Sequence, residues 1–219
     1  LLREKDSKYV EPLHPIAFLP WDHKKFIVQS QKDGYNHLYL YDTDGHELKQ
    51  ITSGRWVVMQ VIGFNKNKHS VIIASNECNP IQRNLFEVDI QTGQRSLLDN
   101  GKGYHYGLLS DDGNYIIDRY SAPDTPRNIE ITNIANKQHL FYFKADNPWK
   151  GYDIPAYECG TIKAADNTTD LYWRMVKPTH FDASKKYPTI IYVYGGPHAH
   201  NVEASWHWGS RSWETYMAQ

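Results

Sequence analysis

Cysteine, excess charge of either sign and long apolar runs are all scarce in this sequence. Its 219 residues include only Cys78 and Cys159, which form neither a disulfide framework nor a zinc-binding pattern, so we expect two buried free thiols. Lys and Arg number 24 against 25 Asp and Glu, and this balance argues against a nucleic-acid partner, which normally requires a basic surface. No apolar run reaches the ~18 residues of a membrane-spanning helix, and we expect no such segment.

The chain opens with LLREKDSKYVEP, which contains neither an initiator Met nor the apolar centre of a signal peptide. We therefore expect an interior piece of a longer protein. Eleven histidines are present, and His198, His200 and His207 lie close together, but their spacing is not that of a zinc site. Loop or surface histidines are the simpler interpretation, and no metal or cofactor is expected.

What the sequence does contain is an internal repeat. Each repeat has an alternating strand, a short turn and a second strand, in the segments HLYLYDTDGHELKQIT (37–52), NLFEVDIQTGQRSLLD (84–99) and NIEITNIANKQHLFYF (128–143). Leu38, Leu85 and Ile129 occupy equivalent positions, 47 and 44 residues apart. Two further apolar strands precede each segment, so each unit has four predicted strands.

Periods of about 40–50 residues with four strands per unit are typical of β-propeller blades. A β-sandwich is the alternative, but it gives no reason for self-similarity at this period. We predict a mainly β chain in which residues 1–146 form about three four-stranded blades, the C-terminal part of a propeller. Because propellers close with about four to eight blades, this array is incomplete.

The pattern changes at DNPWKGYDIPAYECG, a Pro- and Gly-rich stretch with the composition of a linker. Beyond it we predict two strands within 157–178 and a third, almost wholly apolar strand in TIIYVYGGP (189–197), buried on both faces like a central strand of an α/β sheet. A helix is expected to begin near residue 210, with Ser210 or Ser212 as its N-cap. Residues 147–219 are therefore interpreted as the N-terminal part of an α/β domain, which is also incomplete.

The third predicted strand ends in the turn YGGP (194–197). In α/β-hydrolases a Gly-rich loop after the third strand supplies donors to the oxyanion that forms during acyl transfer. The phenol of Tyr194 can donate one such hydrogen bond, and Gly195 and Gly196 permit a sharp bend before Pro197. On spacing alone, a plain strand-ending turn with Tyr194 as a packing residue is the more economical interpretation.

The run HFDASKKYPTIIYVYGGPHA (180–199) resembles the start of the catalytic domain in the dipeptidyl peptidase IV group of the prolyl oligopeptidase family. The upstream segments KDGYNHLYLYD (32–42), ITSGRWVVMQV (51–61) and NLFEVD (84–89) are similar to its last propeller blades. The resemblance implies an internal fragment with propeller blades followed by the first strands of an α/β-hydrolase domain. It also implies that Tyr194 is the side-chain oxyanion donor.

The same resemblance implies a serine exopeptidase that releases N-terminal X-Pro or X-Ala dipeptides from peptide substrates. A periplasmic or extracytoplasmic location and a homodimer of the full-length protein are further family-based expectations. No substrate-binding residue is carried over to this chain.

The nucleophile of that family lies in a Gly-x-Ser-x-Gly motif, which this chain lacks, because WGSRSW (208–213) has no flanking glycines of the required spacing. We expect the whole Ser-Asp-His triad to lie outside this chain, and predict that the chain alone is inactive. The alternative is a non-catalytic relative, in which the same architecture serves as a binding or scaffold protein.

Overall fold

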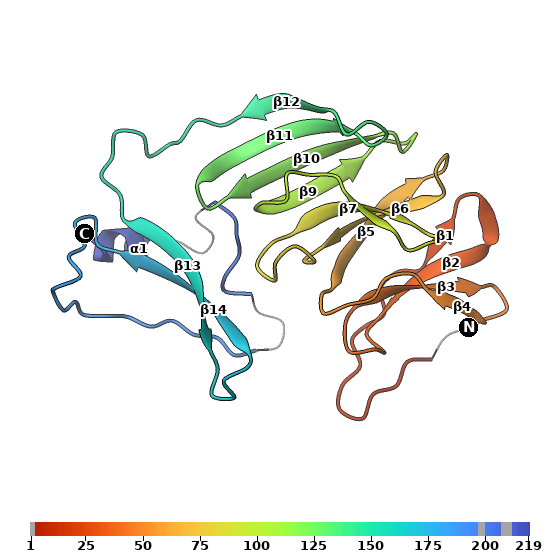
Figure 1. Ribbon diagram of the computed structural model, residues 1–219, viewed down its shortest axis with the longest axis horizontal. Coiled ribbons are helices and arrows are strands. Elements are labelled where there is room, and N and C mark those ends of the chain that lie inside the picture. The colour runs from red at the N-terminus through yellow and green to blue at the C-terminus, as the bar shows by residue number, and fades with distance from the viewer. Residues whose placement is uncertain (1–2, 197–199, 207–211) are drawn as a thin grey trace.

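The computed structural model describes residues 3–196, 200–206 and 212–219. Four antiparallel sheets follow one another along the chain (Figure 1). The first three have four strands each and are called blades 1, 2 and 3. Their strands are β1 (Ala17–Leu19), β2 (Asp22–Ser30), β3 (His37–Asp42) and β4 (Glu47–Gln50); β5 (Val58–Asn65), β6 (Ser70–Ser75), β7 (Asn84–Asp89) and β8 (Arg95–Leu97); and β9 (Tyr104–Leu109), β10 (Tyr115–Ala122), β11 (Thr125–Asn133) and β12 (His139–Lys144).

Within each blade the strands lie side by side in chain order. The equivalence predicted from the repeat is also present, because Leu38, Leu85 and Ile129 lie in β3, β7 and β11, the third strand of each sheet. The three four-stranded units that the repeat predicts are therefore present as three antiparallel sheets.

Apolar side chains from neighbouring blades form the core, and blade 2 contributes from both of its faces. Successive side chains of a strand point to opposite faces of the sheet. Val71 and Ile73 of β6 accordingly join a buried cluster with Leu38 of blade 1. The intervening Ile72 joins a second buried cluster with Ile116 of blade 3. This alternation explains why β6 is apolar at every position of its centre.

A two-stranded sheet follows the blades and contains β13 (Ala156–Lys163) and β14 (Asp170–Lys177). The last element is a short helix, α1 (Ser212–Met217), which begins close to the predicted position near residue 210. Of the two predicted N-caps, Ser212 is the first helical residue rather than the cap, and Ser210 lies outside the described residues. Two contacts join the helix to the hairpin. The Tyr157 and Thr215 hydroxyls are 2.7 Å apart, and a guanidinium nitrogen of Arg174 lies 3.3 Å from a Glu214 carboxylate oxygen.

The third strand predicted in TIIYVYGGP is wrong for the part of it that the structure describes. Residues 189–196 form no strand, and β13 and β14 pair with each other. Ile190, Ile191 and Val193 are 66%, 84% and 79% exposed, so the predicted burial on both faces is also wrong. A central strand needs neighbouring strands that complete its backbone hydrogen bonds, and no described strand lies in that position.

The two cysteines are free thiols, as predicted, but both are exposed rather than buried. Cys78 lies in the loop between β6 and β7, outside the clusters that join the blades. Cys159 lies in β13, whose hairpin is largely exposed. The sequence indicated the oxidation state of the thiols, whereas their burial depended on which elements cover them.

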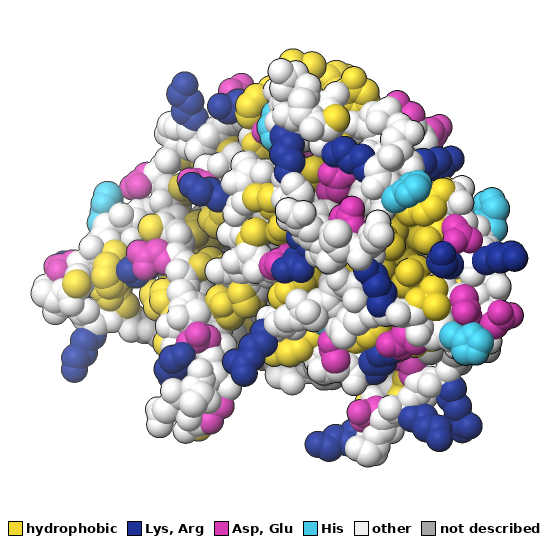
Figure 2. Space-filling view, turned by 45° about the vertical axis from the view of Figure 1, so that its right-hand side comes forward, with side chains coloured by type: hydrophobic (Ala, Val, Ile, Leu, Met, Phe, Trp, Pro, Cys, Tyr) yellow, Lys and Arg dark blue, Asp and Glu magenta, His cyan; other side chains and the backbone are white. Residues whose placement is uncertain are grey.

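The surface carries both signs of charge. On the face shown in Figure 2, basic and acidic side chains are interspersed, and neither sign gathers in one region.

Strand β12 exposes four large apolar side chains, Leu140, Phe141, Tyr142 and Phe143. No helix among the described residues is long and apolar enough to cross a membrane.

Candidate functional site

Tyr194, the predicted oxyanion donor, lies in an extended segment between β14 and α1. Its side chain is 58% exposed, and its ring folds back over the following backbone. A Cβ atom added at Gly196 would lie 2.8 Å from the Tyr194 hydroxyl oxygen, whereas one added at Gly195 would meet no atom within 4 Å. The Tyr194 ring therefore leaves no room for a side chain at position 196, which must be glycine, whereas position 195 is not restricted in this way. Pro197 lies outside the described residues.

The Tyr194 hydroxyl belongs to an exposed side chain and makes no hydrogen bond to the residues that the structure describes. The arrangement can therefore supply one hydrogen bond, and a reaction centre would have to come from residues beyond this loop.

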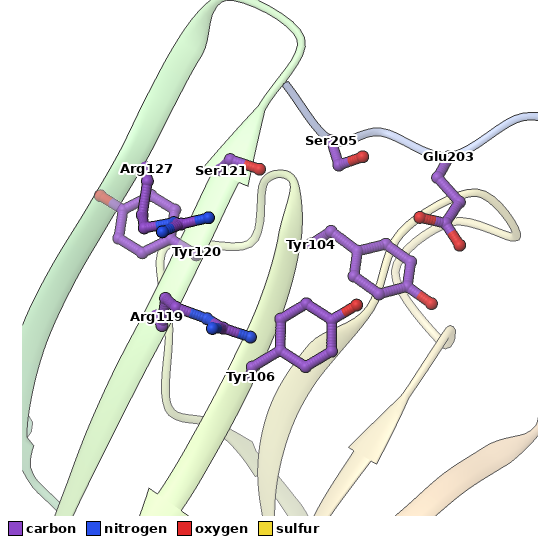
Figure 3. Close-up of a pocket in the computed structure, with 8 residues that line it drawn as sticks. All are labelled: Tyr104, Tyr106, Arg119, Tyr120, Ser121, Arg127, Glu203 and Ser205. Carbon is purple, nitrogen blue, oxygen red and sulfur yellow. The ribbon is translucent and has the colours of Figure 1, made fainter. Parts of the chain in front are cut away.

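A second feature is a cavity of about 250 Å³ between blade 3 and the segment that follows the Gly-Gly turn (Figure 3). Its walls come from β9, β10 and β11 on one side and from residues 203–205 on the other. The lining side chains are Tyr104, Tyr106, Arg119, Tyr120, Ser121, Arg127, Glu203 and Ser205.

Strand register explains why side chains from two strands meet in the cavity. Arg119 of β10 lies directly opposite Tyr106 of β9, and Ser121 lies opposite Tyr104. Residues i and i+2 of a strand share one face, so all four project to the same side of blade 3. The wall of the cavity is thus built from two cross-strand pairs.

Two hydrogen bonds hold residues 203–206 against the blades. The backbone N–H of Ala204 donates to the Ile81 carbonyl oxygen at 2.7 Å, and the backbone N–H of Trp206 donates to Ser121 Oγ at 3.1 Å. The Ala204 side chain is buried. These contacts close the cavity on the side opposite β9 and β10.

Positive charge surrounds Tyr106. The guanidinium carbons of Arg83 and Arg119 lie 5.2 Å and 5.0 Å from the centre of its ring, within the range of cation–π attraction. The Arg83 guanidinium donates to the Gln60 side-chain oxygen at 2.5 Å and to the His105 carbonyl oxygen at 3.4 Å. Burial lowers the pKa of Arg83, as expected for a cation whose hydrogen-bond partners are neutral.

Glu203 is the one carboxylate among the cavity residues, and its environment weakens its charge. Burial raises the pKa of Glu203, and the hydrogen bond from Tyr104 and the charge of Arg83 offset only part of that effect. Burial and the nearby Glu203 charge raise the pKa of Tyr104 to about 12. Tyr104 therefore remains a neutral hydrogen-bond donor at physiological pH.

A buried His–Asp pair lies on the opposite face of the same strands. His105 Nδ1 is 2.6 Å from a carboxylate oxygen of Asp118, and His105 Nε2 is 2.8 Å from the Lys102 carbonyl oxygen. Both side chains of the pair are buried. No described serine, threonine or cysteine side chain is hydrogen-bonded to this histidine, so the pair is a structural feature of blade 3 rather than part of a catalytic triad.

Asp42, Asp44 and His46 are the residues in the described part of the chain that group closely enough to hold a metal ion, with ligand atoms within 4.8 Å of one another. They lie in the turn between β3 and β4. One Asp42 carboxylate oxygen already accepts the backbone N–H groups of Asp44 and His46, at 3.0 Å and 2.8 Å. This grouping is explained by the hydrogen bonds of the turn. Of the clustered histidines considered in the sequence, His198 and His207 lie outside the described residues.

The sequence identified Tyr194 but not the cavity. The alternation in YHY (104–106) and DRYS (118–121) was a usable signal, because it places Tyr104, Tyr106, Arg119 and Ser121 on one face if the two strands pair. Nothing in the sequence places residues 203–205 opposite that face. The structure does not bring Tyr194 into the cavity lining.

Comparison with known proteins agrees with this architecture. Residues 1–127 match the family described as "Dipeptidyl peptidase IV (DPP IV) N-terminal region". Dipeptidyl peptidase 4 of Trichophyton equinum is 26% identical over 94% of this chain and 28% of its own length. Prolyl endopeptidase FAP of Bos taurus is 30% identical over 88% of this chain and 26% of its own length.

Two solved structures have the same fold over nearly all of this chain. A putative dipeptidyl aminopeptidase IV from Bacteroides ovatus superposes with a TM-score of 0.88 and 42% identity, over 97% of this chain and 33% of that one. Porphyromonas gingivalis dipeptidyl peptidase 4 gives a TM-score of 0.82 and 29% identity, over 93% of this chain and 28% of that one. The chain thus spans between a quarter and a third of the length of these relatives, and it belongs to the dipeptidyl peptidase IV family.

Proposed function

We propose that this chain is part of a serine exopeptidase that releases N-terminal dipeptides from peptides with Pro or Ala at the second position. Family membership supports the activity, because relatives that match most of this chain are named dipeptidyl peptidases. The observation within the chain that carries the proposal is the Tyr194 phenol. It is exposed, free of described hydrogen-bond partners, and placed over Gly196 at the site where an oxyanion donor is expected.

The proposed division of labour follows the two parts of the chain. Residues 1–146 would be propeller blades, and residues 147–219 would be the first part of the α/β-hydrolase domain. The exposed apolar residues Ile190, Ile191 and Val193 support the second assignment, because they have the composition of a buried strand that still requires neighbours. In a complete domain such neighbours would pair with this segment and place Tyr194 at its end.

The chain by itself is proposed to be inactive, because it contains no Gly-x-Ser-x-Gly motif to provide a nucleophile. The full-length protein would act on peptides in a periplasmic or other extracytoplasmic compartment, as a homodimer. The compartment and the homodimer are proposed from family membership alone.

Chromogenic dipeptide substrates test the proposal directly. We expect the full-length protein to release p-nitroaniline from Gly-Pro-p-nitroanilide and Ala-Pro-p-nitroanilide, and residues 1–219 alone to release none. A Gly-Leu-p-nitroanilide control separates a proline-directed exopeptidase from a general aminopeptidase. A full-length protein that cleaves none of the three would favour the non-catalytic scaffold, and labelling of the chain alone by a fluorophosphonate would contradict its proposed inactivity.

A further inference from the structure

We propose that the cavity on blade 3 binds a carboxylate group of a peptide, held by the guanidinium groups of Arg119 and Arg127. The inference rests on the proposed peptidase function for the peptide nature of the ligand. The carboxylate preference comes from the cavity itself. The cavity does not include Tyr194, so this role is separate from oxyanion stabilisation.

The charge of the lining favours an anion. Two arginines and one glutamate line the cavity, and Arg83 lies just behind it against Tyr106. Neither Arg119 nor Arg127 forms an ion pair with any residue that the structure describes, although 13 such pairs occur elsewhere. Their guanidinium N–H groups remain available in a recess that already contains uncompensated positive charge.

The geometry favours a planar anion held by two neighbouring guanidinium groups. Figure 3 shows the Arg119 and Arg127 side chains extending in the same direction from neighbouring strands. The Tyr106 ring, in contact with the guanidinium of Arg119, restricts that side chain to one side of the cavity. A guanidinium presents parallel N–H groups that match the two oxygens of a carboxylate. Two guanidiniums that reach out from neighbouring strands suit a carboxylate better than a spherical halide.

Glu203 limits the charge that the ligand can carry. Its carboxylate lies on the opposite wall, next to the Tyr104 side chain (Figure 3), and would repel a dianion such as phosphate more than a monoanion. When Glu203 is ionised, two guanidiniums and one carboxylate leave a net charge of +1 (2 − 1) on the lining, which a single carboxylate neutralises. The hydroxyl of Ser205 adds a neutral hydrogen-bonding group beside it.

Chain connectivity places the cavity within reach of a peptide that contacts Tyr194. Glu203 follows Tyr194 by nine residues. Nine residues span at most ~30 Å when fully extended, which sets an upper limit on the distance between Tyr194 and Glu203. An extended peptide of at most about nine residues could therefore contact the Tyr194 hydroxyl and also place a carboxylate in the cavity. This carboxylate would be either the C-terminal carboxylate or that of an acidic side chain.

Binding to residues 1–219 tests the site without any catalysis. Calorimetric titration with Gly-Pro-Gly-Gly as the free acid and as the C-terminal amide isolates the terminal carboxylate. Gly-Pro-Asp-Gly-amide and Gly-Pro-Asn-Gly-amide isolate the side-chain source. We expect the acid, the Asp peptide or both to bind roughly tenfold or more tightly than the matched neutral peptide, as charge-assisted hydrogen bonds require. The double variant Arg119→Gln/Arg127→Gln should lose that preference.

Arg55→Gln is the control, because it removes another exposed guanidinium that does not line the cavity, and it should keep the preference. Equal urea midpoints would show that all variants are folded. The proposal is overturned if acidic and neutral peptides bind alike, if none binds, if inorganic phosphate binds as tightly as the preferred peptide, or if the arginine variants behave as wild type. Chromogenic turnover by the full-length protein is measured separately, so loss of the peptidase proposal and loss of the carboxylate site remain distinguishable.

Discussion

His105 is a buried titratable residue whose protonation is coupled to the fold. It is fully buried in blade 3, stacks on Tyr120 with ring centres 4.7 Å apart, and contacts Asp118. Burial alone would lower the pKa of His105, but the hydrogen bond to Asp118 and the charges of Asp118 and Asp99 outweigh it and raise the pKa. The folded state therefore binds the imidazole proton more tightly than the unfolded chain does.

This coupling predicts that stability falls as pH rises. A histidine with a raised folded-state pKa stabilises the protein fully below its unfolded pKa of about 6.5, and loses that contribution as pH passes through the higher folded value. We expect the free energy of unfolding in urea to decrease between pH 6 and pH 9. The decrease should be smaller in His105→Gln, and a variant with the wild-type slope would contradict the assignment.

Gly103 is a residue at which a side chain cannot be accommodated. Its φ is +95°, and an added Cβ would collide with the Ser121 carbonyl oxygen of β10. Gly34 has a similar φ of +99° with no atom within 4 Å, so it serves as a control for backbone strain alone. Gly34→Ala should cost about 1 kcal/mol, and Gly103→Ala about 1–3 kcal/mol more. Equal losses in urea unfolding would show that β10 does not restrict this position.

Among the secondary-structure elements, β6 carries the packing between blades. Ile72 is fully buried in the cluster shared by blades 2 and 3, so Ile72→Ala should cost about 2–5 kcal/mol in the free energy of unfolding. Ile191, 84% exposed in the segment before Tyr194, is the matched control, and Ile191→Ala should change stability by about 0.5 kcal/mol or less. A large loss in the control would mean that this segment is packed in the isolated chain.

The blade strands could be predicted because each carries a local signal. An alternating pattern such as that in NLFEVD follows from the geometry of one strand, and its repetition along the chain identified the units. The segment around Ile190 and Ile191 carries an equally strong strand pattern, yet it is exposed. A strand also depends on partners from elsewhere, and its own residues do not show whether those partners are present.

In the candidate site, too, one part carries a local sequence signal and the other part does not. Tyr194 could be identified from a short motif and a resemblance. The cavity required the register of Arg119 against Tyr106 and the position of Glu203, which is 84 residues from Arg119 in the chain. Register and long-range contacts are properties of the folded chain, so the sequence alone could not provide this part of the site.

For the molecule as a whole, residues far apart in sequence come together in two places. Blade 3 and the segment 203–206 enclose the cavity, and the β13–β14 hairpin contacts α1. The segment between β14 and α1 contains Tyr194, and its residues around Tyr194 are largely exposed. The proposed catalytic centre would form where the propeller blades and the proposed hydrolase domain meet, with Tyr194 as the contribution of this chain.

Steady-state kinetics of the full-length Tyr194→Phe variant on Gly-Pro-p-nitroanilide tests this central claim most directly. Removing the phenol hydroxyl while keeping the ring should lower kcat by roughly 10²–10³-fold and leave KM nearly unchanged, because the hydrogen bond forms only to the oxyanion. Tyr192→Phe, which removes the same hydroxyl two residues earlier, should retain wild-type kcat. A Tyr194→Phe enzyme with wild-type kcat would contradict the account.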